Sequence, residues 1–195
     1  MSRFTVRRTL LAVLAASAAC VSLPAFASKE KPVIGFSIDD LRVERWARDR
    51  DYFIAAAKGL GAEVSVQSAD GDSAKQVAQI ENLISKKVDV LVIVPKDQST
   101  LTNVLKEAKK AGIKVVSYDR LIKSPDVDVY ISFDNYRVGQ MQGAALMKAL
   151  PKGSIYVMSG DPGDNNAKLF KAGALSEIDP FVKKGDIKIL GEQAV

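Results

Sequence analysis

The sequence contains no histidine, and its single cysteine, Cys20, lies within the first 27 residues. Without histidine the chain lacks the commonest general base, and His-ligated metal sites and the usual hydrolytic triads are excluded. A single cysteine forms no internal disulfide, so the fold must depend on burial of apolar side chains. The nucleotide-binding motifs GxGxxG and GxxxxGK[ST] are also absent. We therefore expect no catalytic residue, no metal site and no cofactor.

The first 27 residues are typical of an export leader. Three arginines precede an apolar run from Leu10 to Leu23, which is short for a membrane span, and Ala25-Phe26-Ala27 has the small-x-small form of a cleavage site. We expect residues 1–27 to be a cleavable signal peptide, with the mature chain starting near Ser28 in the periplasm. A lipoprotein acylated at Cys20 is the alternative interpretation.

The charge of the chain is nearly balanced once this leader is removed. The whole sequence has 28 basic and 23 acidic residues, and three of the basic residues lie in the leader, which leaves 25 against 23 and a net charge of +2. A charge this small indicates neither nucleic acid nor a membrane surface as a partner. No later segment of the sequence is apolar enough to cross a membrane.

Five short runs of β-branched and apolar residues each end in polar side chains. Helical patterns separate most of these runs, and strands that alternate with helices form parallel sheets, where ligands bind beyond the carboxyl ends of the strands. We therefore expect an α/β fold, a parallel sheet flanked by helices, with a binding site at the strand ends. The runs and their polar ends are Val33–Ile38 before Asp39-Asp40, Val88–Val94 before Lys96-Asp97, Ile113–Ser117 before Asp119-Arg120, Val127–Ser132 before Asp134-Asn135, and Ile155–Met158 before residues 161–166.

Apolar residues at helical spacing predict four helices, each with one stripe buried on the sheet. Ser73, Ser99 and Asn135 are the predicted N-caps. A fifth helix is expected from about residue 164 to 184, and a last strand at 187–190. The predicted stripes are Trp46, Phe53, Ala56, Ala57 and Leu60; Val77, Ile80, Leu83 and Ile84; Leu101, Val104, Leu105 and Ala108; and Val138, Met141, Ala145 and Leu146.

A change in the connections divides the expected fold into two lobes. Between Tyr118 and Ile131 only a short polar turn joins two strand-like runs, where a further crossover would need a helix. We expect an N-terminal sugar-binding lobe over residues 28–132 and the first part of a second α/β lobe over residues 133–195. Two complete lobes need roughly 200 to 300 residues, so we expect the second lobe to be incomplete.

The residues at the strand ends have the chemistry of a sugar site. A pyranose presents hydroxyl groups that both donate and accept hydrogen bonds, so its site needs carboxylates, guanidinium or amide donors and an aromatic plane. Asp119-Arg120 supplies an acceptor and a rigid donor at one strand end. An N-capping aspartate beside a solvated arginine is the alternative interpretation of this pair.

Five segments resemble the ribose/galactose-type family of periplasmic substrate-binding proteins. They are VIGFSIDDLRVERWARDRDYF, QIENLISKKVDVLVIVPKD, KEAKKAGIKVVSYDR, YISFDNYRVGQ and GDPGDNNAKLFKAG. The DR and FDN sequences belong to the wider family, whereas IDDLRxERW and DNNAK resemble its D-xylose-binding branch. The resemblance implies a type I periplasmic-binding-protein-like fold of two lobes hinged around a sugar. It also implies that the chain is the substrate-binding component of an ABC sugar importer, with D-xylose or a related pentose as ligand.

The resemblance favours Asp119, Arg120, Asp164 and Asn166 as sugar contacts, and the positions of Arg45, Trp46 and Asn135 beside strand ends add these three. The predicted sugar-binding residues are therefore Arg45, Trp46, Asp119, Arg120, Asn135, Asp164 and Asn166. Some of them have a second interpretation. Trp46 also lies on an apolar stripe and would serve as a core anchor. Asn135 would bond either the sugar or the hinge backbone, and at least one residue of 164–166 is expected to be an ordinary N-cap. We expect Lys96 to be solvated.

The resemblance also implies the partners. They are the monosaccharide and the membrane subunits of an ABC permease, with the protein itself a monomer. A periplasmic sensor for a chemoreceptor would have the same cleft and is the main alternative. A glycosidase that uses two strand-end aspartates is the enzymatic alternative. A sugar-responsive repressor would carry a DNA-binding helix-turn-helix where this chain has an export leader.

Overall fold

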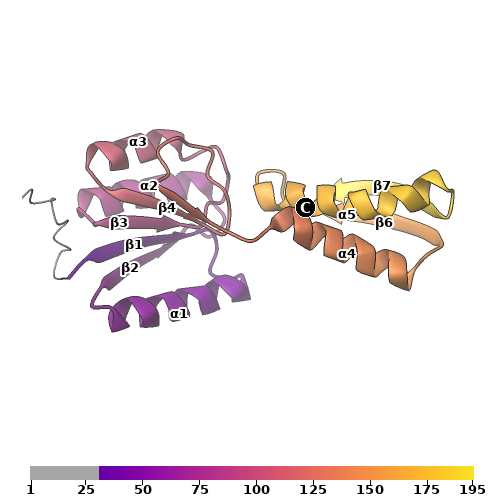
Figure 1. Cartoon of the computed structure of the whole chain (residues 1–195). Coiled ribbons are helices and arrows are strands. Elements are labelled where there is room, and N and C mark those ends of the chain that lie inside the picture. Colours follow the sequence, from indigo (N-terminus) through magenta and orange to yellow (C-terminus); the bar gives the residue numbers. More distant parts are fainter. Residues whose placement is uncertain (1–30) are drawn as a thin grey trace, which may run out of the picture.

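Five parallel strands form the sheet of the N-terminal part of the molecule. The computed structural model describes residues 31–195, and the strand order in this sheet is β2-β1-β3-β4-β5, with every neighbouring pair parallel (Figure 1). The α/β fold with a parallel sheet expected from the sequence is thereby confirmed. The strands are β1 (Val33–Ile38), β2 (Glu63–Ser68), β3 (Val90–Ile93), β4 (Lys114–Tyr118) and β5 (Val129–Ile131).

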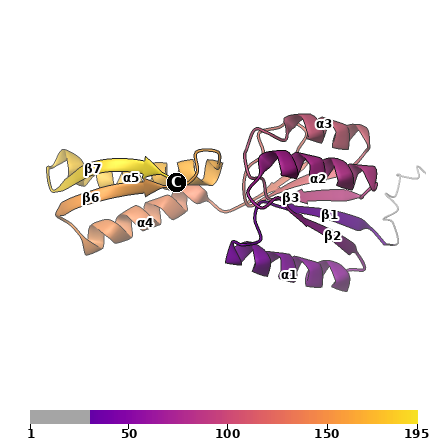
Figure 2. The ribbon, with the colours of Figure 1, turned by 180° about the vertical axis from the view of Figure 1, so that it is seen from behind.

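The two faces of this sheet bury different helices, because side chains alternate along each strand. Helix α1 (Glu44–Gly59) covers the face that carries Phe36 and Ile38 of β1. Helices α2 (Ser73–Ser85) and α3 (Thr102–Lys110) cover the face that carries Leu91 and Ile93 of β3 (Figures 1 and 2). With helices on both faces, the carboxyl ends of the strands remain as the place where a ligand can reach the sheet.

The second part of the molecule contains a smaller sheet. It consists of α4 (Asn135–Ala149), β6 (Gly153–Ser159), α5 (Asn165–Lys183) and β7 (Ile187–Ala194), and β6 and β7 pair in parallel. Helix α5 covers one face of this strand pair and α4 packs along α5 (Figure 1). Within residues 31–195 no helix covers the opposite face of the pair (Figure 2). The chain passes from the first part to the second through residues 132–134.

The predicted stripes of α2 and α3 are confirmed, whereas that of α1 is partly wrong. Ile80 and Leu83 of α2 and the whole predicted stripe of α3 are buried. In α1, Trp46 and Ala57 are buried, but Ala56 is exposed, and Leu60, which follows the last residue of the helix, is 86% exposed.

The predicted stripe of α4 is wrong. Met141 is 62% exposed, and Leu146 is also exposed. The buried side of α4 instead contains Gly139 and Gly143, which lie against the backbone of α5 at Phe170 and Ala174, together with Asn135 and Met147. Small residues let two helix backbones approach closely, so the contact face is marked by glycine and not by large apolar side chains.

One strand was missed, and two caps were placed wrongly. Strand β2 (Glu63–Ser68) was not among the predicted runs, because its apolar residues alternate with polar ones. Asp72 caps α2 through the N–H groups of Ala74 and Lys75, so the predicted cap Ser73 is the first helical residue. Asp134 likewise caps α4 in place of Asn135.

The third predicted cap, Ser99, is also wrong. Helix α3 begins at Thr102, and Ser99 instead donates its backbone N–H to the carboxylate of Asp97. The predicted signal peptide at residues 1–27 and its alternative acylation site, Cys20, lie outside the described residues. Among the helices of residues 31–195, none has the length and apolar character needed to span a membrane.

The α4–α5 contact generates a stability prediction. A Cβ atom added at Gly139 would overlap the backbone carbonyl of Phe170, whereas one added at Gly59, near the end of α1, would meet no atom within 4 Å. Gly139→Ala should therefore lower the free energy of unfolding by about 1–3 kcal/mol through overpacking. Gly59→Ala should raise it by about 0.5 kcal/mol, because alanine favours the helix. Urea denaturation of both variants measures this, and equal effects would contradict the packing described.

Candidate ligand-binding site at the strand ends

The seven predicted site residues lie together where the two parts of the molecule meet. We call them the strand-end cluster: Arg45 and Trp46 in the first turn of α1, Asp119 and Arg120 after β4, Asn135 at the start of α4, and Asp164 and Asn166 at the start of α5. Parallel strands bring their carboxyl ends to one edge of a sheet, and this places the residues after β1 and β4 side by side. The first turn of α5 reaches the same edge from the second part.

Asp119 is the centre of the cluster. Its Oδ2 accepts a hydrogen bond from Arg45 Nη2 at 2.5 Å, and its Oδ1 accepts one from Asn166 Nδ2 at 3.0 Å. The backbone oxygen of Asp119 accepts from Ser132 Oγ at 2.6 Å and from Asn166 Nδ2 at 3.1 Å. Asp119 has a backbone φ of 61°, in the left-handed region that Asp visits more readily than most residues. The residue is buried, so these contacts hold its carboxylate in one orientation.

Arg120 connects two carboxylates from different parts of the chain. Its Nη1 donates to Asp39 Oδ2 at 2.6 Å and to the Pro95 carbonyl at 3.3 Å. Its Nε lies 3.2 Å from Asp164 Oδ2. All three charged side chains are largely buried, which makes each ion pair stronger than one on an open surface. The solvated arginine that was the alternative interpretation is therefore wrong.

Trp46 is a core residue with charged neighbours. The side chain packs with Phe36 and Ile38 and is 4% exposed, as expected for a core anchor. The Arg45 guanidinium lies 4.5 Å from the centre of its ring, and that of Arg120 lies 5.6 Å away. Both distances are in the range of cation–π attraction, so the ring also orients the two donors of the cluster.

Asn135 and Asn166 form a buried link between the two helices of the second part. Asn135 Nδ2 donates to Asn166 Oδ1 at 2.9 Å and to Ser132 Oγ at 3.0 Å. Asn135 therefore bonds the side chain of Ser132, and in this structure no bond joins its side chain to the hinge backbone. Asp164 is the N-cap of α5 and accepts from the backbone N–H of Asn166 at 2.8 Å, which confirms that one residue of 164–166 is an ordinary cap.

Two ion-pairing residues of this region were missed or misjudged. Asp39 was noted at the end of β1 but not assigned to the site, although it binds Arg120. Lys96, which was expected to be solvated, pairs with Asp161 of the second part. Beside this pair the backbone N–H of Gln98 donates to the Gly163 carbonyl at 3.2 Å. Asp39 and Arg120 carry opposite charges and follow two strands of one sheet, a signal that could have been used to pair them.

The Lys96–Asp161 pair changes the titration of both groups. The hydrogen bond from Lys96 lowers the pKa of the Asp161 carboxyl below its ordinary 3.8, and the backbone N–H of Gly163 adds to this effect. The same hydrogen bond raises the pKa of the Lys96 ammonium above its ordinary 10.5. The pair therefore stabilises the folded contact between the two parts across the whole neutral range.

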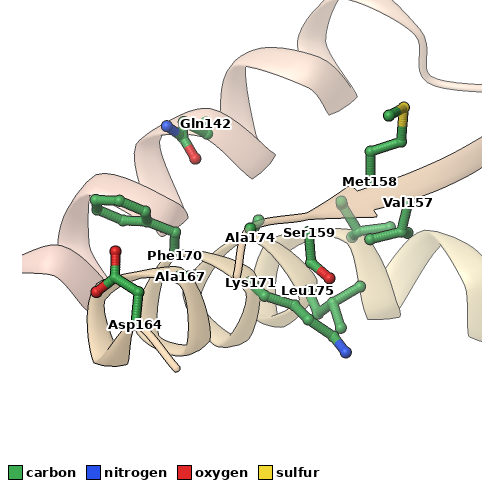
Figure 3. Close-up of a pocket in the computed structure, with 12 residues that line it drawn as sticks. Gln142, Val157, Met158, Ser159, Asp164, Ala167, Phe170, Lys171, Ala174 and Leu175 are labelled. Atoms are coloured by element: carbon green, nitrogen blue, oxygen red, sulfur yellow. The ribbon is translucent and has the colours of Figure 1, made fainter. Parts of the chain in front are cut away.

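A separate hollow of about 360 Å³ lies on the second part. It is lined mainly by apolar side chains of α5 and β6, and Figure 3 shows Asp164 and Phe170 at one end and Val157 and Met158 at the other. Asp164 is the one residue that it shares with the strand-end cluster. Its lining is mainly apolar and includes no arginine, whereas the cluster brings two arginines and two carboxylates together, so the cluster is the better candidate site for a polyol. No group of residues among 31–195 has the composition and spacing to hold a metal ion.

Parallel α/β architecture with polar residues gathered at the strand ends, at the junction with a second α/β part, defines the type I periplasmic-binding-protein fold. The model of the family described as periplasmic binding protein domain matches residues 34–195. The chain belongs to this family.

Relatives of known name are similar in sequence. A D-xylose-binding periplasmic protein of Haemophilus influenzae is 52% identical over 162 residues, which are 83% of this chain and 49% of that protein. The D-xylose-binding periplasmic protein of Escherichia coli is 50% identical over 188 residues, which are 96% of this chain and 56% of that protein. The chain spans about half the length of the curated relatives that it matches.

Solved structures are similar in fold. An ABC transporter solute binding protein from Clostridium phytofermentans with bound β-D-glucose has a TM-score of 0.78 and 39% identity, covering 80% of this chain and 51% of that one. The fructose binding periplasmic domain of a hybrid two component system has a TM-score of 0.74 and 28% identity, covering 84% and 53%. The first of these neighbours holds β-D-glucose, and the second is a fructose binding domain.

The Lys96–Asp161 pair generates a titration prediction. Because the folded-state pKa of Asp161 lies below 3.8, its contribution to stability is present above that pH and is lost as the pH falls through the folded pKa. In Lys96→Met the carboxyl titration of Asp161, followed by carbon-13 NMR, should move up toward 3.8. Asp128 is the internal control, because Lys114 and the Val115 N–H lower its pKa independently. An unmoved Asp161 would show that the two loops are not paired in solution.

Proposed function

We propose that this chain is the substrate-binding component of a periplasmic ABC sugar importer and that it binds a monosaccharide, D-xylose, at the strand-end cluster. The observation that carries the proposal is the convergence of seven predicted residues into one network at the junction of the two parts. Identity of 50–52% to two D-xylose-binding periplasmic proteins supports the choice of sugar.

The chemistry of the cluster suits a neutral polyol. Asp119 and Asp164 are charged hydrogen-bond acceptors, and Arg45 and Arg120 are rigid donors. The side-chain amides of Asn135 and Asn166 can both donate and accept hydrogen bonds. A few charge-assisted hydrogen bonds suffice for micromolar affinity, which corresponds to about −8 kcal/mol.

The proposed function also implies a location and a partner for the chain. The leader at residues 1–27 would deliver the chain to the periplasm, where the sugar-bound form would be presented to the permease by a monomer. Closure would be a hinge motion at residues 132–134 that brings the start of α5 onto the strand ends. The chain would act by binding alone and would catalyse no reaction.

A sensor function is the second candidate. It is favoured by the similarity to the fructose binding periplasmic domain of a hybrid two component system. Binding of the sugar would be the same in both cases, and only the partner of the closed form would differ. Co-purification with an ABC permease or with a receptor distinguishes the two.

Calorimetry with D-xylose tests the proposal. Because the chain covers about half of its relatives, the protein for this test is the 195-residue chain continued by the C-terminal half of the E. coli relative. We expect micromolar binding that Asp119→Ala or Arg120→Ala weakens by about 2 kcal/mol or more, roughly 30-fold, since each change leaves a buried charge unpaired.

Arg42→Ala is the matched control. Arg42 pairs with Asp40 on the exposed loop after β1, outside the strand-end cluster, so its loss should leave the affinity unchanged. Full affinity in both cluster variants would refute the assignment of the site. Failure of the extended chain to bind any pentose or hexose would refute the function, and turnover of a chromogenic xyloside would favour the glycosidase.

A further inference from the structure

Two buried polar atoms beside Arg120 have no hydrogen-bond partner. They are Asp39 Oδ1 and Trp46 Nε1, and both belong to residues that are at least 95% buried. A buried donor or acceptor that has lost its water and gained no partner is costly, and native structures contain few of them. Two such atoms next to one guanidinium therefore call for a specific explanation.

Only one of the two carboxylate oxygens of Asp39 has a hydrogen-bond partner within the protein. Its Oδ2 is held by Arg120 Nη1 at 2.6 Å, which fixes the direction of the other oxygen. The residue directly follows β1, so it stands at the carboxyl edge of the sheet, where ligands of parallel α/β folds bind. A carboxylate fixed by an arginine, with one oxygen free, is a strong and directional acceptor for a hydroxyl group.

Trp46 supplies the complementary donor. Its ring borders the same guanidinium, with Arg120 Cζ 5.6 Å from the ring centre. The indole N–H can only donate, and a buried indole usually finds an acceptor. A hydroxyl-bearing ligand offers both the donor that Asp39 lacks and the acceptor that Trp46 lacks.

We propose that Asp39 is a further sugar-contacting residue, whose free Oδ1 accepts a hydrogen bond from one ligand hydroxyl while Trp46 Nε1 donates to an oxygen of the same ligand. The inference rests on the proposed function and adds a contact that determines which hydroxyl pattern is accepted. Asp39 thus has two roles, because the oxygen that does not face the sugar holds Arg120 in place.

A panel of deoxy sugars separates direct contact from support of Arg120. The extended chain, its Asp39→Asn variant and its Trp46→Phe variant are titrated with D-xylose and with the four analogues that each lack one ring hydroxyl. Asp39→Asn should weaken D-xylose binding roughly 10- to 100-fold, the range expected when a charge-assisted hydrogen bond is lost. One analogue lacks the hydroxyl that Asp39 binds, so the wild type cannot form this hydrogen bond with it either. For that analogue, the factor by which Asp39→Asn weakens binding should be at least fivefold smaller than for D-xylose.

A supporting role alone would give a different pattern. If Asp39 acted only through Arg120, the variant would weaken all five ligands by the same factor, and that result would overturn the proposal. Asp40→Asn is the matched control, because Asp40 is the neighbouring carboxylate but pairs with exposed Arg42, and it should leave all five affinities unchanged.

The remaining outcomes are also decisive. If Asp39→Asn does not fold, Trp46→Phe, which keeps an aromatic ring in the core but removes the indole N–H together with the five-membered ring, must show the same coupling to one ligand oxygen. Uniform weakening of all five ligands would overturn the proposal. If the unmodified extended chain binds none of the sugars, the proposed function itself has failed. If the wild type binds D-xylose but the variants weaken all five ligands equally, only the assignment of Asp39 as a sugar contact is refuted.

Discussion

The buried carboxylate of Asp119 is the interaction on which the arrangement of this molecule depends. It accepts one hydrogen bond from the guanidinium of Arg45 in α1 and one from the side-chain amide of Asn166 in α5. A buried carboxylate must be compensated by donors, and here the donors come from segments 74 and 47 residues away in the chain. The charge of one side chain therefore fixes how β4, α1 and α5 meet.

Hydrogen bonds and ion pairs join four pairs of residues across the junction of the two parts at this edge. The side chain of Asn166 donates a hydrogen bond to Asp119, and the N–H of Gln98 donates one to the Gly163 carbonyl. Ion pairs join Arg120 to Asp164 and Lys96 to Asp161. A junction of this kind can open to water at modest cost, because water replaces the hydrogen bonds that are lost. A sugar that bonds both parts would favour the closed arrangement by its differential affinity for it.

Much of this site could be predicted from the sequence, because the residues at strand ends are confined to one edge by the parallel sheet. The position of Asp119 follows from a β-branched run that stops abruptly, and Arg45 was chosen for its place off the apolar stripe at the start of the first helix. The resemblance to a family selected Asp164 and Asn166. The pairing of Lys96 with Asp161 could not be foreseen, since it depends on how two separate sheets approach each other. The error in α4 has a different physical cause: its glycines, not its large apolar residues, face α5.

We propose that the strand-end cluster is a single ligand site shared by the two parts. A crystal structure of the extended chain grown with D-xylose tests it most directly. We expect one sugar within hydrogen-bond distance of Asp119, Arg120 and at least one residue from the start of α5. A sugar bound elsewhere, such as in the apolar hollow beside Phe170, with the contacts of Asp119 unchanged, would contradict it.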